Sequence, residues 1–298
     1  MRPTDRTGLA IVLSLIALAL FDAMGLVIKL LSDRYTPMEL SAWRNLFGLI
    51  PAVIAVVASA AWRSAGRPLK IRQWRLALWR GAIVTLAQLS FYTALGYMAF
   101  ATATTIAYAN ALFMTALAVP LLGEKVGWVR WGSVIVGFIG VVLVMQPGSD
   151  AFTVYAILPL FAALFYALVG VTARMFDEEV PTPLISLYAS VMALVFSFCL
   201  TLFFGGFTPV QSWADMGWLA MMGAFGGTAV LFLVASYRMT EQSNLAPFNY
   251  FGIPMAFFMG WLFFNETPWD ALFPGALLIA AGGLMIVWRE RRLQARGV

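Results

Sequence analysis

Apolar stretches of about 20 residues follow one another along almost the whole chain, and this succession restricts the folds that it can adopt. Of the 298 residues, 62% are hydrophobic and only 11% are charged. Soluble domains average about 45–50% apolar and about 25% charged residues, and a soluble surface of this size requires more polar side chains than the chain provides. The sequence therefore predicts an all-α polytopic membrane protein rather than a soluble enzyme.

Proline, glycine and short charged segments divide these stretches into ten predicted transmembrane helices. Residues 96–102 form the least marked division, because they are almost uncharged. A break is still required there, since the combined stretch is too long for one crossing. The predicted spans are residues 8–31, 37–61, 76–98, 102–122, 127–146, 153–175, 182–204, 214–237, 244–264 and 271–288.

Lysine and arginine are concentrated in every second segment between the predicted helices. If the N-terminus is cytoplasmic, the inner segments include the basic stretches 63–75 and 289–296, whereas the outer segments contain Arg34, with Lys29 close by. Cytoplasmic loops of membrane proteins carry an excess of Lys and Arg. The bias therefore predicts that both termini are cytoplasmic, and it supports an even number of spans.

Several classes of site are excluded by residues that the chain lacks. It has no histidine and a single cysteine, Cys199, so it has no ordinary zinc or haem site and no internal disulfide. The net charge of +5 comes from short inner segments, which indicates membrane topology rather than nucleic-acid binding. No Walker-type glycine-rich loop is present. We therefore expect no metal, no cofactor, no nucleic-acid partner and no hydrolysis of ATP by the chain itself.

The two halves of the sequence resemble each other. Segment 118–125 ends span four, and a similar segment, 260–267, follows about 142 residues later; each contains a glutamate shortly before a tryptophan. Near the start of each half, Ser41 matches Ser186 at an offset of 145. A repeat of five spans inserts its second copy upside down, and inverted repeats are typical of transporters whose substrate site lies between the halves. The predicted halves are residues 1–147 and 148–298.

These motifs, in this order and spacing, resemble the drug/metabolite transporter superfamily, and its EamA-type members in particular. The resemblance rests on Lys29 at the end of span one, on the segments 41–45 (Ser-Ala-Trp-Arg-Asn) and 120–124 (Pro-Leu-Leu-Gly-Glu), and on the echo at 262–266 (Leu-Phe-Phe-Asn-Glu). It implies ten helices in two inverted five-helix halves, a location in the bacterial inner membrane and movement of small metabolites. Many relatives have a Trp-Gly pair in span one where this chain has Phe-Asp at 21–22, and this departure indicates a narrower subgroup.

Two opposite charges lie deep in the first two predicted spans. Asp22 is roughly 13 Å from the outer end of span one, and Arg44 is roughly 10 Å from the outer end of span two. An ionisable group at this depth is costly unless it is paired or hydrated, so it indicates function. Two interpretations remain open: a structural ion pair that locks the two spans, or an Asp22 carboxylate that binds a substrate cation or a coupling proton.

Polar side chains form stripes along other predicted spans, and such stripes should face protein or water rather than lipid. They either join helices by hydrogen bonds or line a central cavity. Span three carries three such residues, span four two, and spans six and nine add aromatic and amide groups. The candidate substrate-binding residues are Asp22, Arg44, Thr85, Gln88, Tyr92, Thr104, Tyr108, Tyr166, Asn249 and Tyr250.

Three further charges are predicted to have structural roles. Lys29 is expected to extend from the end of span one to the membrane interface. Glu124 and Glu266 are each expected to cap the N-terminus of the helix that follows, where a carboxylate meets the positive end of the helix dipole. A role in a gate is the alternative for both.

Taken together, these features predict a secondary transporter that moves a small organic metabolite, such as an amino acid, a vitamin or a nucleoside-like solute, by alternating access. Its partners would be the solute, the lipid bilayer and a coupling proton, and it would act as a monomer or a homodimer. The alternatives are an intramembrane enzyme acting on lipid-linked substrates, for which we find no catalytic constellation, and a receptor that does not transport.

The predicted topology can be tested with reporter fusions. A reporter that is active only outside the cytoplasm should stay silent when it is fused after Val298, because ten spans return the C-terminus to the cytoplasm. The same reporter fused after Asp150, in a predicted outer segment, should be active. Activity after Val298 would contradict the ten-span topology.

Overall fold

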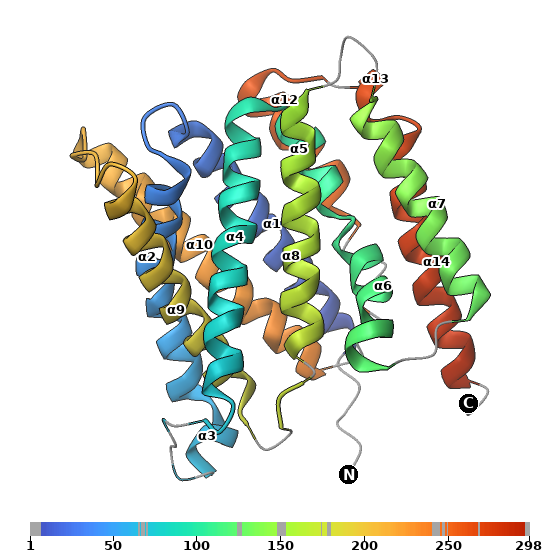
Figure 1. Cartoon of the computed structure of the whole chain (residues 1–298), viewed down its shortest axis with the longest axis horizontal. Helices are drawn as coiled ribbons and strands as arrows, with labels where there is room; N and C mark the ends of the chain where they lie inside the picture. Colours follow the sequence, from blue (N-terminus) through green and yellow to red (C-terminus); the bar gives the residue numbers. More distant parts are fainter. Residues whose placement is uncertain are drawn as a thin grey trace.

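A computed structural model shows an all-helical protein over the part of the chain that it describes (Figure 1). The described residues are 7–64, 66, 69, 71–123, 127–147, 153–173, 175–177, 180–239, 245, 248, 250–267 and 269–295.

The long helices lie side by side and run alternately in opposite directions, so that α1 begins and α14 ends at the same end of the bundle (Figure 1). The elements are α1 (Thr7–Leu31), α2 (Pro37–Ala58), α3 (Ala60–Ser64), α4 (Trp74–Tyr97), α5 (Phe100–Ala107), α6 (Asn110–Leu122), α7 (Trp128–Met145), the 3-10 turn η1 (Val154–Ala156), α8 (Ile157–Ala173), α9 (Thr182–Phe203), α10 (Trp213–Met239), α12 (Gly252–Phe264), α13 (Trp269–Leu272) and α14 (Gly275–Ala295).

Six of the described helical stretches are long and apolar enough to cross a membrane: Gly8–Leu31, Pro37–Ala58, Phe100–Leu122, Val154–Ala173, Pro183–Phe203 and Trp213–Leu233. Three shorter apolar helices cover Trp131–Met145, Gly252–Phe264 and Gly275–Met285. Together they confirm a multi-pass helical membrane protein.

Local sequence explains where several helices begin and end. Thr36 caps α2: its Oγ1 accepts a hydrogen bond from the Glu39 amide (3.3 Å), and the Glu39 carboxylate accepts one from the Thr36 amide (2.7 Å). This reciprocal capping box, followed by Pro37 in the first turn, favours helix initiation. At the far end of α6, Gly123 adopts a left-handed conformation (φ 69°), which stops the helix.

The predicted fourth span, residues 102–122, is not one continuous helix. It consists of α5 and α6, which are separated at Tyr108 and Ala109. Both residues keep right-handed helical dihedral angles (Tyr108 φ −65°, ψ −10°; Ala109 φ −61°, ψ −7°), so the interruption is a tight turn between two nearly continuous helices, and Ala109 is fully buried. At this turn the Tyr108 ring lies beside that of Tyr250, with ring centroids 6.3 Å apart.

Close packing through glycine joins α7 to α14. A Cβ atom at Gly140 would lie 2.6 Å from the Gly275 carbonyl oxygen, and one at Gly282 would lie 2.7 Å from the Ser133 carbonyl oxygen. Contacts this short leave no room for a side chain. Small residues allow the backbones of membrane helices to approach closely, which is a main source of helix association in lipid.

This packing can be tested with a matched pair of substitutions on one helix. Gly140→Leu should force α7 away from α14 and lower stability by about 1–3 kcal/mol, the usual cost of overpacking. Gly132→Leu is the control, because a Cβ atom there would meet nothing within 4 Å. The thermal midpoint of the purified protein is the measurement, and equal midpoints for the two variants would contradict the account.

Candidate substrate site inside the helical bundle

Polar atoms from several helices are buried in the interior without a hydrogen-bond partner. They include Asp22 Oδ2 on α1, Arg44 Nε on α2, Tyr92 OH on α4, Thr104 Oγ1 on α5 and Tyr250 OH just before α12. Buried polar groups in proteins are normally hydrogen-bonded, and each exception requires an explanation. Unsatisfied polar atoms contributed by five parts of the bundle are consistent with an interior site for a polar ligand.

Asp22 and Arg44 do not neutralise each other. The ion pairs among the described side chains are Lys29–Glu266 and Arg34–Asp215. The structural pair between spans one and two, one of the two interpretations that the sequence left open, is therefore not formed in this structure. Asp22 is nevertheless only 5% exposed, so its carboxyl group lies in the interior.

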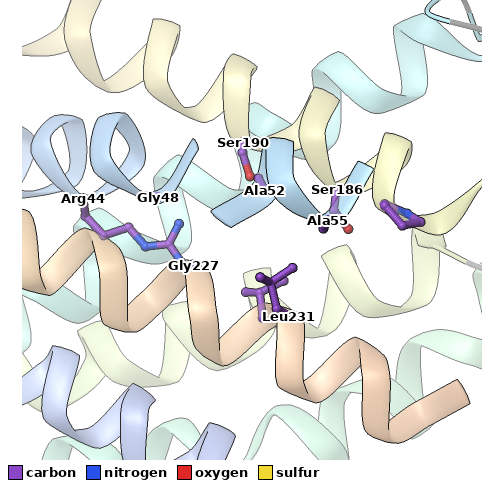
Figure 2. Close-up of a pocket in the computed structure, with 10 residues that line it drawn as sticks. Arg44, Gly48, Ala52, Ala55, Ser186, Ser190, Gly227 and Leu231 are labelled. Carbon is purple, nitrogen blue, oxygen red and sulfur yellow. The ribbon is translucent and has the colours of Figure 1, made fainter. Parts of the chain in front are cut away.

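The Arg44 side chain extends from α2 toward α10 (Figure 2). Its Nη1 donates a hydrogen bond to the amide oxygen of Asn45 (3.0 Å). Its Nε and Nη2 lie 2.9 and 3.1 Å from the point where a Cβ atom would stand at Gly226. A side chain at position 226 would therefore collide with the guanidinium group, which fits there because residue 226 is glycine.

Arg44 also lines one end of a narrow pocket between α2, α9 and α10 (Figure 2). The pocket has a volume of about 40 Å³, far below the roughly 300–1,000 Å³ of pockets that bind drug-sized ligands. An organic metabolite requires more space, so the helices must separate before one can enter here. The lining residues are Arg44, Gly48, Ala52, Ala55, Pro183, Ser186, Ser190, Gly227, Val230 and Leu231.

Gln88 belongs to a buried hydrogen-bond network that joins α4 to α2. Its Oε1 accepts hydrogen bonds from Ser41 Oγ (2.7 Å) and Asn45 Nδ2 (2.9 Å), and its Nε2 donates to Asn45 Oδ1 (3.2 Å). The network also holds Arg44 through Asn45. Gln88 thus joins α4 to α2, which is one of the two roles predicted for the polar stripes. Through Asn45 it also helps to orient the Arg44 side chain.

Thr85 has a similar interhelical role about one turn earlier on α4. Its Oγ1 lies within hydrogen-bonding distance of the carbonyl oxygens of Gly81 (3.1 Å) and Ala193 (3.3 Å). Ala193 belongs to α9, so the hydroxyl group helps to join these two helices.

The predicted tyrosines contribute rings and hydroxyl groups to the interior. Tyr92 of α4 is 1% exposed, and Tyr166 of α8 is half-buried. The ring centroids of Tyr108 and Tyr250 are 6.3 Å apart, and the hydroxyl group of Tyr250 lies against Gly283 of α14. Asn249, another predicted site residue, lies outside the described residues.

Lys29, which we expected to extend from the end of span one, is held by partners at the end of α1. Its Nζ forms an ion pair with Glu266 (2.7 Å), donates a hydrogen bond to the Met98 carbonyl oxygen and lies 5.2 Å from the centroid of the Phe264 ring. The sequence did not indicate this pair, because Glu266 is distant in sequence and only the fold brings it close.

Glu266 does cap a helix, but not the one that follows it. Its Oε2 accepts a hydrogen bond from the Phe100 amide at the start of α5 (2.7 Å). The carboxylate thus meets the positive end of the α5 dipole while it pairs with Lys29. Glu124, the predicted counterpart, lies outside the described residues.

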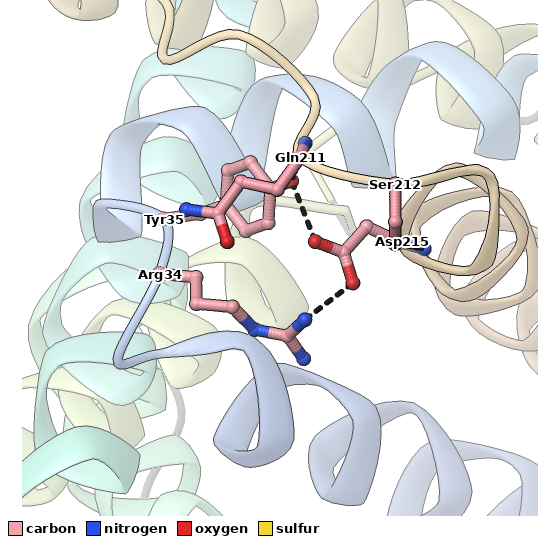
Figure 3. A network of polar contacts seen from close by, with 5 residues as sticks. All are labelled: Arg34, Tyr35, Gln211, Ser212 and Asp215. Carbon is pink, nitrogen blue, oxygen red and sulfur yellow. Dashed lines mark hydrogen bonds and ion pairs between the residues drawn. The ribbon is translucent and has the colours of Figure 1, made fainter.

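A second polar cluster joins the α1–α2 loop to the start of α10 at the same end of the bundle (Figure 3). Asp215 pairs with Arg34 (2.5 Å) and accepts a hydrogen bond from the Tyr35 hydroxyl group (3.0 Å). The Gln211 amide donates to the Tyr35 oxygen (3.2 Å). The predicted spans put Arg34 in an outer segment and the start of the span at residues 214–237 on the same side, so the opposite charges of Arg34 and Asp215 were the available signal for this contact.

Comparisons with known proteins agree with this architecture. The sequence model of the EamA-like transporter family matches residues 8–146 and again 153–288. A solved structure superposes with a TM-score of 0.65 over 96% of this chain and 98% of its own, at 17% identity, which supports the fold alone.

Curated relatives cover most of the chain. S-adenosylmethionine uptake transporters from Rickettsia felis and Rickettsia prowazekii are 24% and 25% identical, over 98% and 94% of this chain and 96% and 92% of their own lengths. A riboflavin transporter from Brucella anthropi is 26% identical over 83% of this chain and 87% of its own. The chain therefore belongs to the EamA-like transporter family, and it is a membrane transporter of small metabolites rather than an enzyme.

Proposed function

We propose that this protein is a secondary transporter with ten spans in the bacterial inner membrane, with both termini in the cytoplasm, and that it carries its solute by alternating access. The observation that carries the proposal is a pair of opposite charges, the buried Asp22 and the half-buried Arg44, which lie inside an EamA-type bundle without pairing to each other. Ionisable groups within the membrane typically mark substrate or ion pathways.

The packing of the helices supports two inverted halves, residues 1–147 and 148–298. The first helix of the first half, α1, packs on α10 of the second half. The first helix of the second half, α8, packs in the equivalent way on α4 of the first half. Likewise α2 packs on α10 as α9 packs on α4, while α7 pairs with α14 and α5 with α12. The family model also matches the chain twice. Such a relationship would place the solute near the pseudo-two-fold axis between the halves.

S-adenosylmethionine is the first solute to test. The relatives that bear this name match nearly the full length of the chain, and the solute carries positive and negative groups that suit a site with Asp22 and Arg44. Riboflavin is the second candidate, because riboflavin transporters are also among the relatives and the buried tyrosines offer surfaces on which a flat ring can pack.

Transport can be measured with the purified protein in liposomes. We expect saturable uptake of radiolabelled S-adenosylmethionine or riboflavin, and no uptake by liposomes without protein. Saturable binding of either solute without any flux would contradict the transporter proposal and would favour a receptor.

In this proposal, the two polar clusters close one end of the pathway. The Lys29–Glu266 pair connects α1 to the end of α12 and the start of α5, and the Arg34–Asp215 pair connects α1 to α10. Both ion pairs lie at the end of the bundle that the distribution of Lys and Arg in the sequence predicts to face the outside. An outward-open state would then require these contacts to separate.

A charge-neutral variant tests this gate. Glu266→Gln should weaken the outer closure, because the Lys29 ammonium group loses its ionised partner. A cysteine at Thr104, in a Cys199→Ser background, should then react several-fold faster with a membrane-impermeant thiol reagent added from outside. The control is Asp33→Asn, an exposed charge of the adjacent loop. An unchanged labelling rate in Glu266→Gln would argue against a gate at this end.

A further inference from the structure

We infer that Tyr108 and Tyr250 form an aromatic clamp, which binds a planar heteroaromatic ring of the solute between them. The inference rests on the proposed transport function and specifies the class of solute, a small metabolite that carries a flat heteroaromatic group.

The two tyrosines occupy corresponding positions in the two halves of the chain. Tyr108 and Tyr250 are 142 residues apart, which is the offset of the internal repeat. Each lies two residues before a helix of 13 residues, α6 or α12. Each of these helices ends at a residue in the left-handed conformation, Gly123 or Asn265. Agreement at both ends of the two helices supports an equivalent placement of the tyrosines by the repeat.

Both tyrosines lie at turns where helices of the two halves meet. Tyr108 is in the turn between α5 and α6, and Tyr250 is in the turn before α12. In the bundle α5 packs against α12 and α8, and α12 packs against α1. This packing brings the two rings together, with centroids 6.3 Å apart and planes inclined by 42°. One clamp is thus built from both halves.

The turn at Tyr108 lies near the middle of the membrane. Tyr108 follows the first residue of α5, Phe100, by eight positions, or roughly 12 Å along a helix. The hydrocarbon core of a bilayer is about 30 Å thick. Transporters built from inverted repeats bind their solutes near the midplane, where membrane helices are interrupted. The position of the clamp agrees with such a site.

Each ring is anchored at its hydroxyl end. The Tyr108 hydroxyl oxygen lies in the space that a Cβ atom would fill at Gly252, and the Tyr250 hydroxyl oxygen lies in the corresponding space at Gly283. Both tyrosines are nevertheless half-buried rather than buried. The glycines therefore fix the tip of each ring by close packing, while part of each side chain remains accessible.

The distance between the rings suits a flat guest. Two rings that hold a third one between them need about 7 Å between their centres, because stacked atoms lie about 3.5 Å apart. The centroids of Tyr108 and Tyr250, at 6.3 Å, are within about 1 Å of this separation. A small rotation of the inclined rings would therefore admit a planar group in the offset-stacked arrangement that aromatic rings prefer.

A polar group beside the clamp favours a heteroaromatic ring over a hydrocarbon. Thr104 precedes Tyr108 by four residues, so the two side chains lie on one face of the helix. Thr104 Oγ1 is buried and has no hydrogen-bond partner among the described residues. Buried hydroxyl groups are normally hydrogen-bonded, and a ring nitrogen or oxygen atom of the solute would supply the partner.

Binding to the purified full-length protein tests the clamp with compounds that keep or lack the flat ring. Riboflavin and S-adenosylmethionine carry such a ring, whereas ribitol and methionine are the corresponding parts without it. We expect saturable binding of at least one ring compound. Its part without the ring should bind at least about fivefold more weakly, because stacking of a base on an aromatic side chain contributes that much or more.

Substitutions then assign the ring binding to the two tyrosines. Tyr108→Leu and Tyr250→Leu should each weaken binding of the ring compound about 5- to 150-fold, the usual effect of removing an aromatic side chain that stacks on a base. The phenylalanine variants keep the ring and should bind nearly as tightly as the wild type. Tyr97→Leu is the matched control, because this ring is 62% exposed and stacks on Tyr155 instead. If a leucine variant does not fold, methionine at the same position replaces it, since its flexible side chain fills irregular spaces.

A glycine variant tests how the clamp is positioned. Gly252→Ala places a methyl group where the Tyr108 hydroxyl oxygen lies, so the ring must move and binding should weaken as in Tyr108→Leu. Adding Tyr108→Phe removes that hydroxyl group and should restore binding. Gly132→Ala is the control, because a Cβ atom there would meet nothing within 4 Å.

Several results would overturn the clamp. They are a wild-type protein that binds neither ring compound, ribitol or methionine bound as tightly as its parent compound, and leucine or methionine variants that bind like the wild type. If those variants bind like the wild type and still transport the solute in liposomes, the clamp is refuted and the transport function stands. Ring-dependent binding that the leucine variants lose, without flux of any solute, would support the clamp and contradict the transport function.

Discussion

The cost of placing an ionised side chain inside a membrane bundle is the constraint on which the rest of the structure depends. A buried charge must be paired, hydrogen-bonded or reached by water or ligand. The structure meets this requirement in two ways. At one end, Lys29 and Arg34 have carboxylate partners. In the interior, Asp22 and Arg44 have opposite charges but do not pair with each other, and each has a buried polar atom without a hydrogen-bond partner.

The packing of α10 against α2, next to Arg44, depends on glycine. Glycines bring α10 against α2: a Cβ atom at Gly227 would lie 3.0 Å from the Gly48 carbonyl oxygen, and one at Gly223 would lie 3.0 Å from the Arg44 carbonyl oxygen. The close approach leaves only a small pocket of about 40 Å³ beside the guanidinium group. Small residues at such contacts let the backbones of membrane helices approach closely.

Much of the helical architecture could be predicted from the sequence, because the length of each apolar stretch and the prolines and glycines between them act locally. The start of α2 at Pro37 and the end of α1 at Leu31 agree with the expected boundaries. The break at Tyr108 was missed, since an apolar segment with threonines gives no local signal for an interruption. The partners of Lys29 and Glu266 were missed for a different reason: contacts between residues far apart in sequence depend on how the helices pack. For Asp22, the sequence indicated depth and function, but it could not decide between pairing with Arg44 and remaining free for a solute.

The central claim is that Asp22 and Arg44 lie inside the membrane bundle without pairing with each other, whereas Lys29 and Arg34 are neutralised at one end, and an experimental structure of the protein in lipid nanodiscs tests it most directly. The account predicts that Asp22 and Arg44 stay apart in that structure and that the Lys29–Glu266 and Arg34–Asp215 pairs are either both intact or both separated. A direct ion pair between Asp22 and Arg44 would contradict it.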